Sequence, residues 1–328
     1  MALERIVVKE TPFQEHLDDK LLQNWAQGQE IQLDSLNSPL MEVDLSPHGY
    51  GKVIIQDEST NPTGTIKDHM ALAIRRWYRI FAQTNIKKEY KPNTKVPRIS
   101  ILTAGNAGKA LAHAFKDIMP IKLLVDKEIS PALLRELCQL DADIYQADLS
   151  QPLTSEQIKK LTNNQCGIEL TGRHSRFYLT HASMILGLKP ARLYVPYGSG
   201  QIFDNYLDFQ VMDEEGTVTQ RKQPASICGA EPEQQNSIAD KLTANCKPFA
   251  VYGPQKIQEL QKQKVTGDFT GVYRVNEENI LSAWQKMNEL CPAEPSGAAG
   301  LALYMQHYDQ GLIHPTEKIV VVNTGKGK

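Results

Sequence analysis

The chain has 328 residues, of which 41% are hydrophobic and 23% charged, and its formal net charge is −2. This composition is that of an ordinary globular protein, long enough to bury its own core, and it lacks the basic excess of a nucleic-acid-binding surface. The five cysteines are scattered without a C-x-x-C pair, which argues against a disulfide framework or a zinc site.

Short apolar runs typical of β-strands alternate with helical patterns along most of the chain. The expected strands are Lys52–Gln56, Arg98–Leu102, Ile121–Val125, Ala142–Gln146, Arg192–Pro196, Ser226–Ala230 and Lys318–Asn323. The expected helices are Phe13–Gln27, Asp68–Ala82, Ala107–Ile118, Pro131–Leu140, Glu277–Leu290 and Ser296–Tyr308. The stretch Thr84–Pro97, rich in lysine, asparagine and proline, is expected to be an exposed loop. The alternation predicts an α/β protein with parallel sheets covered on both faces.

Membrane and export signals are not evident in the sequence. The first residues, MALERIVVKET, lack the apolar run of a signal peptide, and no window approaches about 18 uninterrupted apolar residues. Scattered cysteines also favour a reducing compartment. We therefore expect a cytoplasmic protein with no membrane partner.

Ligands of open α/β sheets gather beyond the carboxyl ends of strands, where four glycine-containing segments lie in this sequence. The first runs from Ser59 to Asp68 and places Lys67 at the start of a predicted helix. The positive end of a helix disfavours a lysine cation, which lowers its pKa and favours reaction as an amine nucleophile. Judged alone, this segment favours an exposed lysine beside a capping Asp68.

The other three segments indicate anion binding and close packing. Thr103-Ala104-Gly105-Asn106 offers N–H groups and a hydroxyl to a carboxylate, although an ordinary loop also fits. Gly198-Ser199-Gly200, before a predicted helix, has the composition of a phosphate nest but matches neither G-x-G-x-x-G nor the P-loop. The run Glu294–Gly300 permits close helix packing, and Thr324 follows the last predicted strand.

Taken together and in order, these segments resemble the fold-type II pyridoxal-phosphate (PLP) enzymes, the tryptophan synthase β-subunit superfamily. The matching motifs are Ser38-Pro39-Leu40, Gln56-Asp57-Glu58 with NPTGTIKDH, TAGN, GSG, EPSGAAG and NTG, spanning residues 38–325. The resemblance implies two open twisted sheets with helices on both faces and the cofactor, pyridoxal 5′-phosphate, in a cleft between domains. It implies a smaller, mobile domain of residues 50–170 that carries Lys67 and the Asn106 loop. A larger domain, residues 1–49 and 171–328, would carry the phosphate loop and Thr324.

The resemblance also implies a role for each matching residue and no metal. Lys67 would form the internal aldimine and move the α-proton, and Asn106 would bind the 3′-oxygen of the cofactor. The substrate carboxylate would bind to Thr103, Ala104, Gly105 and Ala107, and the cofactor phosphate to Gly198, Ser199, Gly200 and Gln201. Thr324 would meet the pyridine nitrogen, where a hydroxyl makes the ring a weaker electron sink than a carboxylate would. A hydroxyl at this position suits elimination and replacement reactions more than transamination.

The NPTG-Thr and Thr-Gly-x-Gly motifs are most similar to threonine synthase, so we expect a threonine synthase-like lyase or synthase of amino-acid metabolism. A cysteine synthase-like or serine/threonine dehydratase-like enzyme and a PLP-binding protein without catalysis remain alternatives. For a phosphorylated amino-acid substrate, the extra cations would be Lys109, Arg173, His174 and Arg176, which also fit as surface charges. A nicotinamide oxidoreductase is disfavoured because its glycine fingerprint is missing.

Three departures from the pattern of the family stand out. His69 replaces the usual arginine, Gln56 replaces the common lysine before the acid, and Tyr197 interrupts a glycine-rich loop. They make an unusual substrate specificity or reduced activity conceivable. The family typically forms dimers, so we expect a homodimer with no nucleic-acid partner. The eight histidines show no H-E-x-x-H spacing and are interpreted as surface or packing residues, apart from His69.

Overall fold

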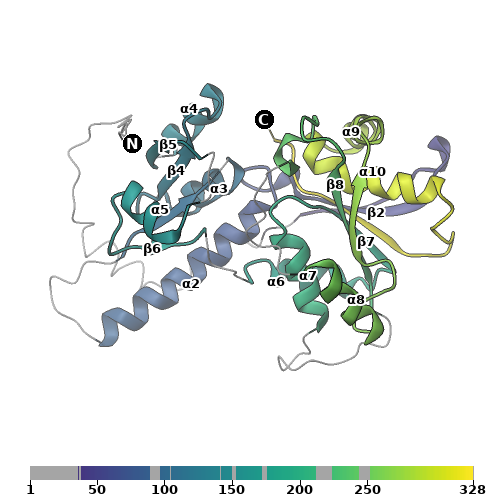
Figure 1. Cartoon of the computed structure of the whole chain (residues 1–328), viewed down its shortest axis with the longest axis horizontal. Coiled ribbons are helices and arrows are strands. Elements are labelled where there is room, and N and C mark those ends of the chain that lie inside the picture. Colours follow the sequence, from purple (N-terminus) through teal and green to yellow (C-terminus); the bar gives the residue numbers. More distant parts are fainter. Residues whose placement is uncertain are drawn as a thin grey trace. The chain divides into compact units, whose positions relative to one another are not determined.

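The computed structural model describes residues 36, 38–88, 97–103, 105–140, 142–149, 153–171, 176–211, 224–243 and 252–327. The described residues divide into two compact units, one within Lys67–Arg173 and the other within Asn37–Ile66 and His174–Lys328. Each unit has its own sheet with helices packed against it (Figure 1). The predicted α/β class with two sheets is therefore confirmed. Within the described ranges, no helix has the length and apolar character needed to cross a membrane.

The first unit is a parallel four-stranded sheet in the order β5-β4-β3-β6. Its strands are β3 (Ile99–Leu102), β4 (Lys122–Asp126), β5 (Asp143–Ala147) and β6 (Ile168–Glu169). Its helices are α2 (Lys67–Lys88), α3 (Asn106–Phe115), α4 (Pro131–Gln139) and α5 (Ser155–Leu161). The central strand β4 is buried along almost its whole length, as expected of a parallel strand covered on both faces. Tyr78 of α2 packs edge-on against Phe115 of α3, with ring centroids 5.8 Å apart.

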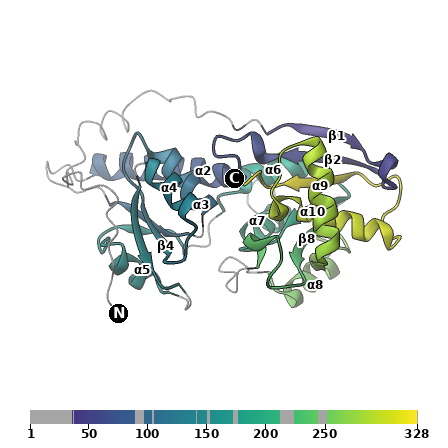
Figure 2. The same cartoon turned by 90° about the horizontal axis from the view of Figure 1, so that it is seen from above.

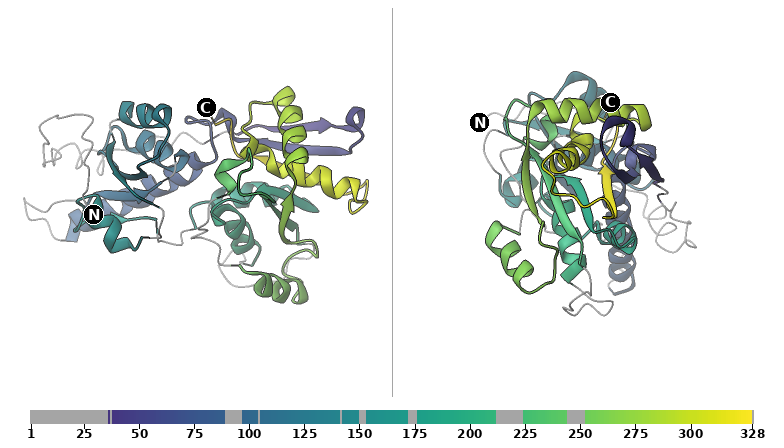
Figure 3. Two further views of the ribbon diagram at one scale, coloured as in Figure 1. Left: turned by 45° about the horizontal axis from the view of Figure 1, so that its top comes forward. Right: turned by 90° about the vertical axis from the view of Figure 1, so that its right-hand side faces the viewer.

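The second unit contains a six-stranded sheet in the order β1-β2-β10-β7-β8-β9. Its strands are β1 (Leu40–Asp44), β2 (Lys52–Asp57), β7 (Arg192–Pro196), β8 (Ser226–Pro232), β9 (Gly271–Val275) and β10 (Ile319–Asn323). Among the described strands of this sheet, only the β1–β2 pair is antiparallel, and Figure 2 shows these two strands side by side. In the right-hand view of Figure 3, the yellow strand β10 lies between the purple hairpin and the teal β7.

Helices cover both faces of this second sheet. They are α6 (Leu179–Gly187), α7 (Gln201–Val211), α8 (Pro254–Lys262), α9 (Glu277–Leu290) and α10 (Pro295–Asp309), with short 3-10 turns η1 (Ser46–His48), η2 (Glu58–Thr60) and η3 (Asp240–Leu242). Cys228 of β8 belongs to the core cluster that α10 completes. The next residue, Gly229, faces Phe203 of α7, because successive strand residues point to opposite faces.

The predicted strands agree with the observed ones within two residues, whereas β6, β9, α5, α6 and α8 were not predicted. Three further differences stand out. Helix α2 continues to Lys88, so the expected loop is wrong for Thr84–Lys88. The first proline of that stretch is Pro92, and lysine and asparagine do not by themselves end a helix. The edge strand β1 was missed because it is only half-buried. The segment 50–66 falls in the second unit rather than with Lys67, because β2 is hydrogen-bonded between β1 and β10. The expected helix Phe13–Gln27 lies outside the described residues.

Candidate functional site

Three of the four predicted segments leave the same edge of the second sheet. Strands β2, β10 and β7 are adjacent and parallel, and Asn323 of β10 is in register with Asp57 of β2. The segments that follow them are residues 58–66, Thr324–Gly327 and Tyr197–Gly200. Because parallel strands end at one edge, these polar segments converge at the carboxyl edge of the sheet, where ligands of α/β proteins bind.

The segment before Lys67 is a turn fixed by the side chain of Asn61. The Asn61 amide nitrogen donates to Oε2 of Glu58 at 2.5 Å and to the carbonyl oxygen of Thr65 at 3.1 Å. The backbone N–H of Gly64 donates to the Asn61 carbonyl at 2.8 Å, and Gly64 has a φ of +77° that favours glycine. The E-x-x-N-P-T-G motif is thus a self-supporting turn that ends at the first residue of α2.

The C-terminal segment is hydrogen-bonded to this turn through backbone groups. The N–H of Ile66 donates to the Thr324 carbonyl at 3.0 Å, and the N–H of Lys326 donates to the Gly64 carbonyl at 3.1 Å. A Cβ atom on Gly325 would lie 2.4 Å from that Gly64 oxygen, so only glycine permits the approach. The closing Thr-Gly motif and the NPTG motif therefore form one local structure, although about 260 positions separate them in the sequence.

Lys67 is the first residue of α2 and is only partly accessible. Burial lowers the pKa of its amine from the ordinary value of 10.5 to about 8. Desolvation disfavours the ammonium form, so a much larger fraction of the amine is neutral near neutral pH than for a surface lysine. The neutral amine is the nucleophilic form.

The Gly198-Ser199-Gly200 loop joins the buried strand β7 to helix α7. Gly200 has a φ of +85°, and its carbonyl accepts the N–H of Asp204 at 2.9 Å, which starts the helix. The N–H groups at the start of such a helix can hold a phosphate. Burial, together with the negative charges of Asp204 and Glu231, raises the pKa of Tyr197 to about 12, so its phenol stays protonated.

The Asn106 loop belongs to the first unit, where it follows β3. The hydroxyl of Thr103 accepts the backbone N–H groups of Gly105 and Gly108, at 3.1 and 3.0 Å. By accepting these two bonds, the Thr103 hydroxyl shapes the loop. Its own proton can still be donated to a ligand. Asn106 is the first residue of α3 and Ala107 the second, both partly buried. Ala104 lies outside the described residues.

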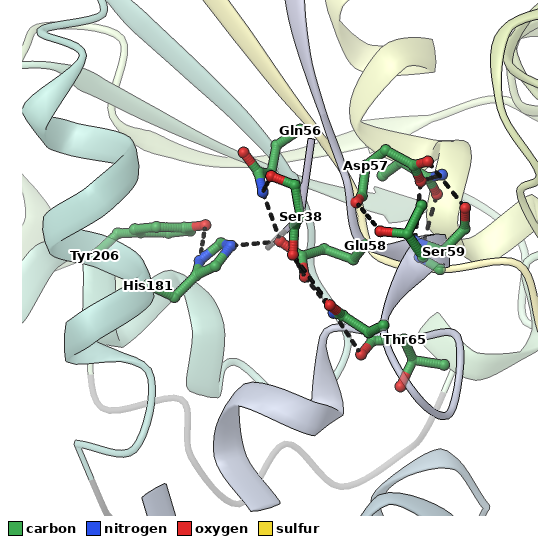
Figure 4. Close-up of polar contacts among 12 residues, drawn as sticks. Ser38, Gln56, Asp57, Glu58, Ser59, Thr65, His181 and Tyr206 are labelled. Atoms are coloured by element: carbon green, nitrogen blue, oxygen red, sulfur yellow. Dashed lines mark hydrogen bonds and ion pairs between the residues drawn. The ribbon is translucent and has the colours of Figure 1, made fainter. Parts of the chain in front are cut away.

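A buried carboxylate missed by the sequence analysis lies beside the turn (Figure 4). Glu58 is fully buried, and its Oε1 is 2.7 Å from Nε2 of His181. Nδ1 of His181 is 3.0 Å from the hydroxyl of Tyr206. His181 was interpreted as a surface or packing residue. The E-x-x-N spacing signals the link of Glu58 to Asn61, whereas nothing in the sequence links Glu58 to a histidine 123 positions away.

Two of the four cations expected to bind a substrate phosphate pair with carboxylates of the protein instead. Lys109 forms an ion pair with Glu136 at 3.3 Å, and Arg176 with Asp208 at 3.4 Å. Arg173 and His174 lie outside the described residues. Lys326, not considered from the sequence, extends its aliphatic chain across Gly64, where an added Cβ would lie 2.6 Å from its Cε. Lys326 is exposed, and no ion pair to it occurs in the described part of the chain.

The residues present fit pyridoxal phosphate. That cofactor requires a nucleophilic amine, an anion-binding loop for its phosphate and a partner for its ring nitrogen. Lys67 supplies an amine with a lowered pKa, Gly198–Gly200 supply a loop at a helix N-terminus, and Thr324 supplies a hydroxyl at the same sheet edge as that loop. The donor set contains an amine, backbone N–H groups and a hydroxyl, which matches the chemistry of the cofactor.

Comparison with known proteins points to the same group. The family model described as "Pyridoxal-phosphate dependent enzyme" matches residues 31–325. A search of curated proteins finds no match. Similar solved structures include O-ureido-L-serine synthase (TM-score 0.67, 14% identity, covering 90% of this chain and 91% of that one). Maize serine racemase is also similar (TM-score 0.65, 17% identity, covering 94% of this chain and 93% of that one). So is threonine deaminase isoform 2 from Solanum lycopersicum (TM-score 0.61, 16% identity, covering 95% of this chain and 90% of that one). At these identities the likeness concerns the fold.

Proposed function

Because the chain belongs to the pyridoxal-phosphate dependent enzyme family, we propose that it is a threonine synthase-like member that eliminates or replaces a substituent at Cβ or Cγ of an amino acid. The chain is a fold-type II enzyme with PLP as its cofactor. The observation that carries the reaction type is the position of Thr324. It follows β10, and its carbonyl is bonded to the residue before Lys67.

In this proposal, each residue of the sheet edge has a defined task. Lys67 would hold the cofactor, and its amine would move the proton at the substrate Cα. Backbone N–H groups at Gly198, Ser199, Gly200 and Gln201 bind the phosphate. PLP, when bound, stabilises negative charge at the substrate Cα. The Thr324 hydroxyl accepts no proton at neutral pH, so it leaves the ring nitrogen unprotonated, which favours loss of a leaving group over transamination.

The first unit would orient the substrate. The N–H groups of Gly105 and Ala107 and the Thr103 hydroxyl bind the substrate carboxylate in this proposal, together with Ala104. Asn106 binds the 3′-oxygen of the cofactor. The hydrogen bonds of Thr103 to Gly105 and Gly108 support this role, because they hold the loop in one conformation before substrate arrives.

Lys326 favours a substrate with an anionic leaving group. Its aliphatic chain lies across Gly64, three residues before Lys67, and its amine is exposed. Lys109 and Arg176, by contrast, already pair with carboxylates. A flexible ammonium group acts as a point charge for a phosphate. The preferred substrate is therefore a phosphorylated amino acid such as O-phosphohomoserine.

Two experiments test this function. Borohydride reduction of the holoenzyme and peptide mapping should place the cofactor on Lys67, and Lys67→Ala should abolish the label; a label on another lysine would refute the site. Next, O-phosphohomoserine, O-acetylserine, serine and threonine are each added while the visible absorbance of the cofactor is recorded. Response and turnover with O-phosphohomoserine support the proposal. A response only to O-acetylserine or serine indicates a cysteine synthase-like, dehydratase-like or racemase activity. No response to any indicates a binding protein.

Lys326 itself is tested by substitution. Lys326→Gln should raise the KM for a phosphorylated substrate about 2- to 5-fold, the effect of one exposed charge pair, and leave the KM for an uncharged substrate unchanged. Lys326→Arg should restore the KM, and added salt should reduce the difference. We further propose that the enzyme acts as a homodimer, which light scattering of the purified protein would check.

A further inference from the structure

The carboxylate of Glu58 is the centre of a buried hydrogen-bond network. Its Oε2 accepts from the Ser38 hydroxyl at 2.8 Å and from the Asn61 amide at 2.5 Å. Its Oε1 accepts from the Gln56 amide at 3.1 Å and lies 2.7 Å from Nε2 of His181. Each oxygen thus has at least two partners, as an ionised carboxylate can accept. A buried carboxylate satisfied in this way has a single favourable orientation.

On one side this network reaches the turn that leads into Lys67. Asn61 is bonded to Glu58 and to the carbonyl of Thr65, so the carboxylate restrains both ends of the turn. The Ser38 hydroxyl shares its one proton between Glu58 Oε2 and Oδ1 of Asn61, at 2.8 and 3.1 Å, so it contacts both residues of this link. The backbone of the turn that ends before Lys67 is therefore linked to the position of Glu58.

On the other side the network reaches the helix that follows the phosphate loop. His181 belongs to α6, and Tyr206 belongs to α7, which begins directly after Gly200. Because an ionised Glu58 only accepts, His181 donates through Nε2, and its Nδ1 then accepts the hydroxyl of Tyr206. Burial and the charge of Glu58 raise the pKa of Tyr206 well above its ordinary value, so the phenol remains a donor.

We propose that Glu58, His181 and Tyr206 form a positioning relay, which holds the Lys67 turn in register with the phosphate-loop helix α7. In the motif of the family a lysine commonly stands before the acidic residue, where this chain has the neutral Gln56. The Glu58 carboxylate here accepts from side-chain donors that include Ser38, Asn61 and Gln56. The relay rests on the proposed role of Lys67. Its members touch neither cofactor nor substrate in this proposal, so they act through the turn.

The fold provides a matched control for this idea. Tyr206 and Tyr194 are both fully buried, and each hydroxyl meets Nδ1 of a histidine, at 3.0 Å for His181 and 3.1 Å for His307. Tyr194→Phe and Tyr206→Phe thus remove the same bond in the same unit. Only the Tyr206 bond belongs to the relay, so a purely structural role predicts the same consequences for both variants.

The test compares Tyr206→Phe, Tyr194→Phe and Ser38→Ala in three measurements. The first is the rate constant with which the apoprotein captures PLP at Lys67. The second is the pH dependence of amine labelling at Lys67 in the apoprotein, followed by peptide mapping. The third is steady-state kinetics, with thermal unfolding recorded alongside. Glu58→Gln is included if it folds, while the milder Ser38→Ala removes one donor to Glu58 without altering the carboxylate.

Tyr206→Phe and Ser38→Ala should each lower the capture rate constant and kcat about 3- to 10-fold, the equivalent of one net hydrogen bond, with KM unchanged. Tyr194→Phe should lower the unfolding temperature comparably but leave both rates within about twofold. Equal rates in the two tyrosine variants would overturn the relay. Failure of the underlying function is distinguishable, since the wild-type borohydride label would then lie on a lysine other than Lys67.

Discussion

The N–H of Ile66 donates to the carbonyl of Thr324 at 3.0 Å, which joins the residue before Lys67 to the residue after the last strand. This bond connects two motifs from opposite ends of the sequence. It also holds the backbone of Thr324 against the turn. The chemistry proposed for Lys67 and Thr324 therefore depends on backbone geometry that substitutions can probe.

The hydroxyl of Thr324 can be removed with little change in shape. Thr324→Val should keep the cofactor bound and lower kcat about 3- to 10-fold, because one hydrogen bond of roughly 0.5–1.5 kcal/mol is lost. Thr324→Ser should recover most of that activity. Steady-state kinetics and the absorbance of the bound cofactor measure the effect. Unchanged kcat in the valine variant would exclude a role for this hydroxyl.

Gly297 packs closely against the segment Asn323–Gly325 that follows the last strand. A Cβ there would come within 2.5 Å of the Gly325 carbonyl oxygen and 2.8 Å of Oδ1 of Asn323. Gly297→Ala should therefore lower the unfolding free energy by about 1–3 kcal/mol and weaken cofactor retention, because the segment bonded to Gly64 must shift. Gly187→Ala is the control, since nothing lies within 4 Å of its added Cβ; urea unfolding should show no loss there.

The phosphate loop is probed through Gly200. Gly200 and Gly49 share a φ of +85°, but Gly49 closes the short turn η1, far from the loop in sequence and at the opposite end of β2 from the carboxyl edge. Alanine at either position should cost roughly 1–2 kcal/mol of backbone strain. Only Gly200→Ala should also weaken PLP binding, as measured by equilibrium titration of the apoprotein. Equal PLP affinity in the two variants would argue against this loop as the phosphate site.

The lowered pKa of Lys67 predicts a pH dependence of stability. Between about 8 and the ordinary value of 10.5, the unfolded chain binds more protons at this residue than the folded apoprotein. Its contribution to the unfolding free energy therefore rises with pH across that window and is constant below it. Lys67→Met should remove this rise. Urea unfolding at a series of pH values checks it, and parallel curves for the two proteins would contradict it.

The same pKa predicts the pH profile of cofactor capture. The rate constant for PLP capture should increase up to about pH 8 and then level off, because the neutral amine is the reacting form. A profile that still rises steeply toward pH 10 would indicate an ordinary exposed lysine. Stopped-flow absorbance with the apoprotein provides the measurement.

The sequence by itself determined the α/β class, most strand and helix positions and the family, because hydrophobic periodicity and glycine-containing turns are local. It also singled out Lys67, Gly198–Gly200 and Thr324, since each directly follows or precedes a predicted element. Only the tertiary structure decided which segments meet. The order β2-β10-β7 brings three of them to one edge, and nothing local encodes that order. The histidine partner of Glu58 was decided in the same way, because the packing of α6 and α7 brings His181 to Glu58 and Tyr206 to His181. Contacts between residues more than 100 positions apart arise from packing of whole elements, which no local pattern records.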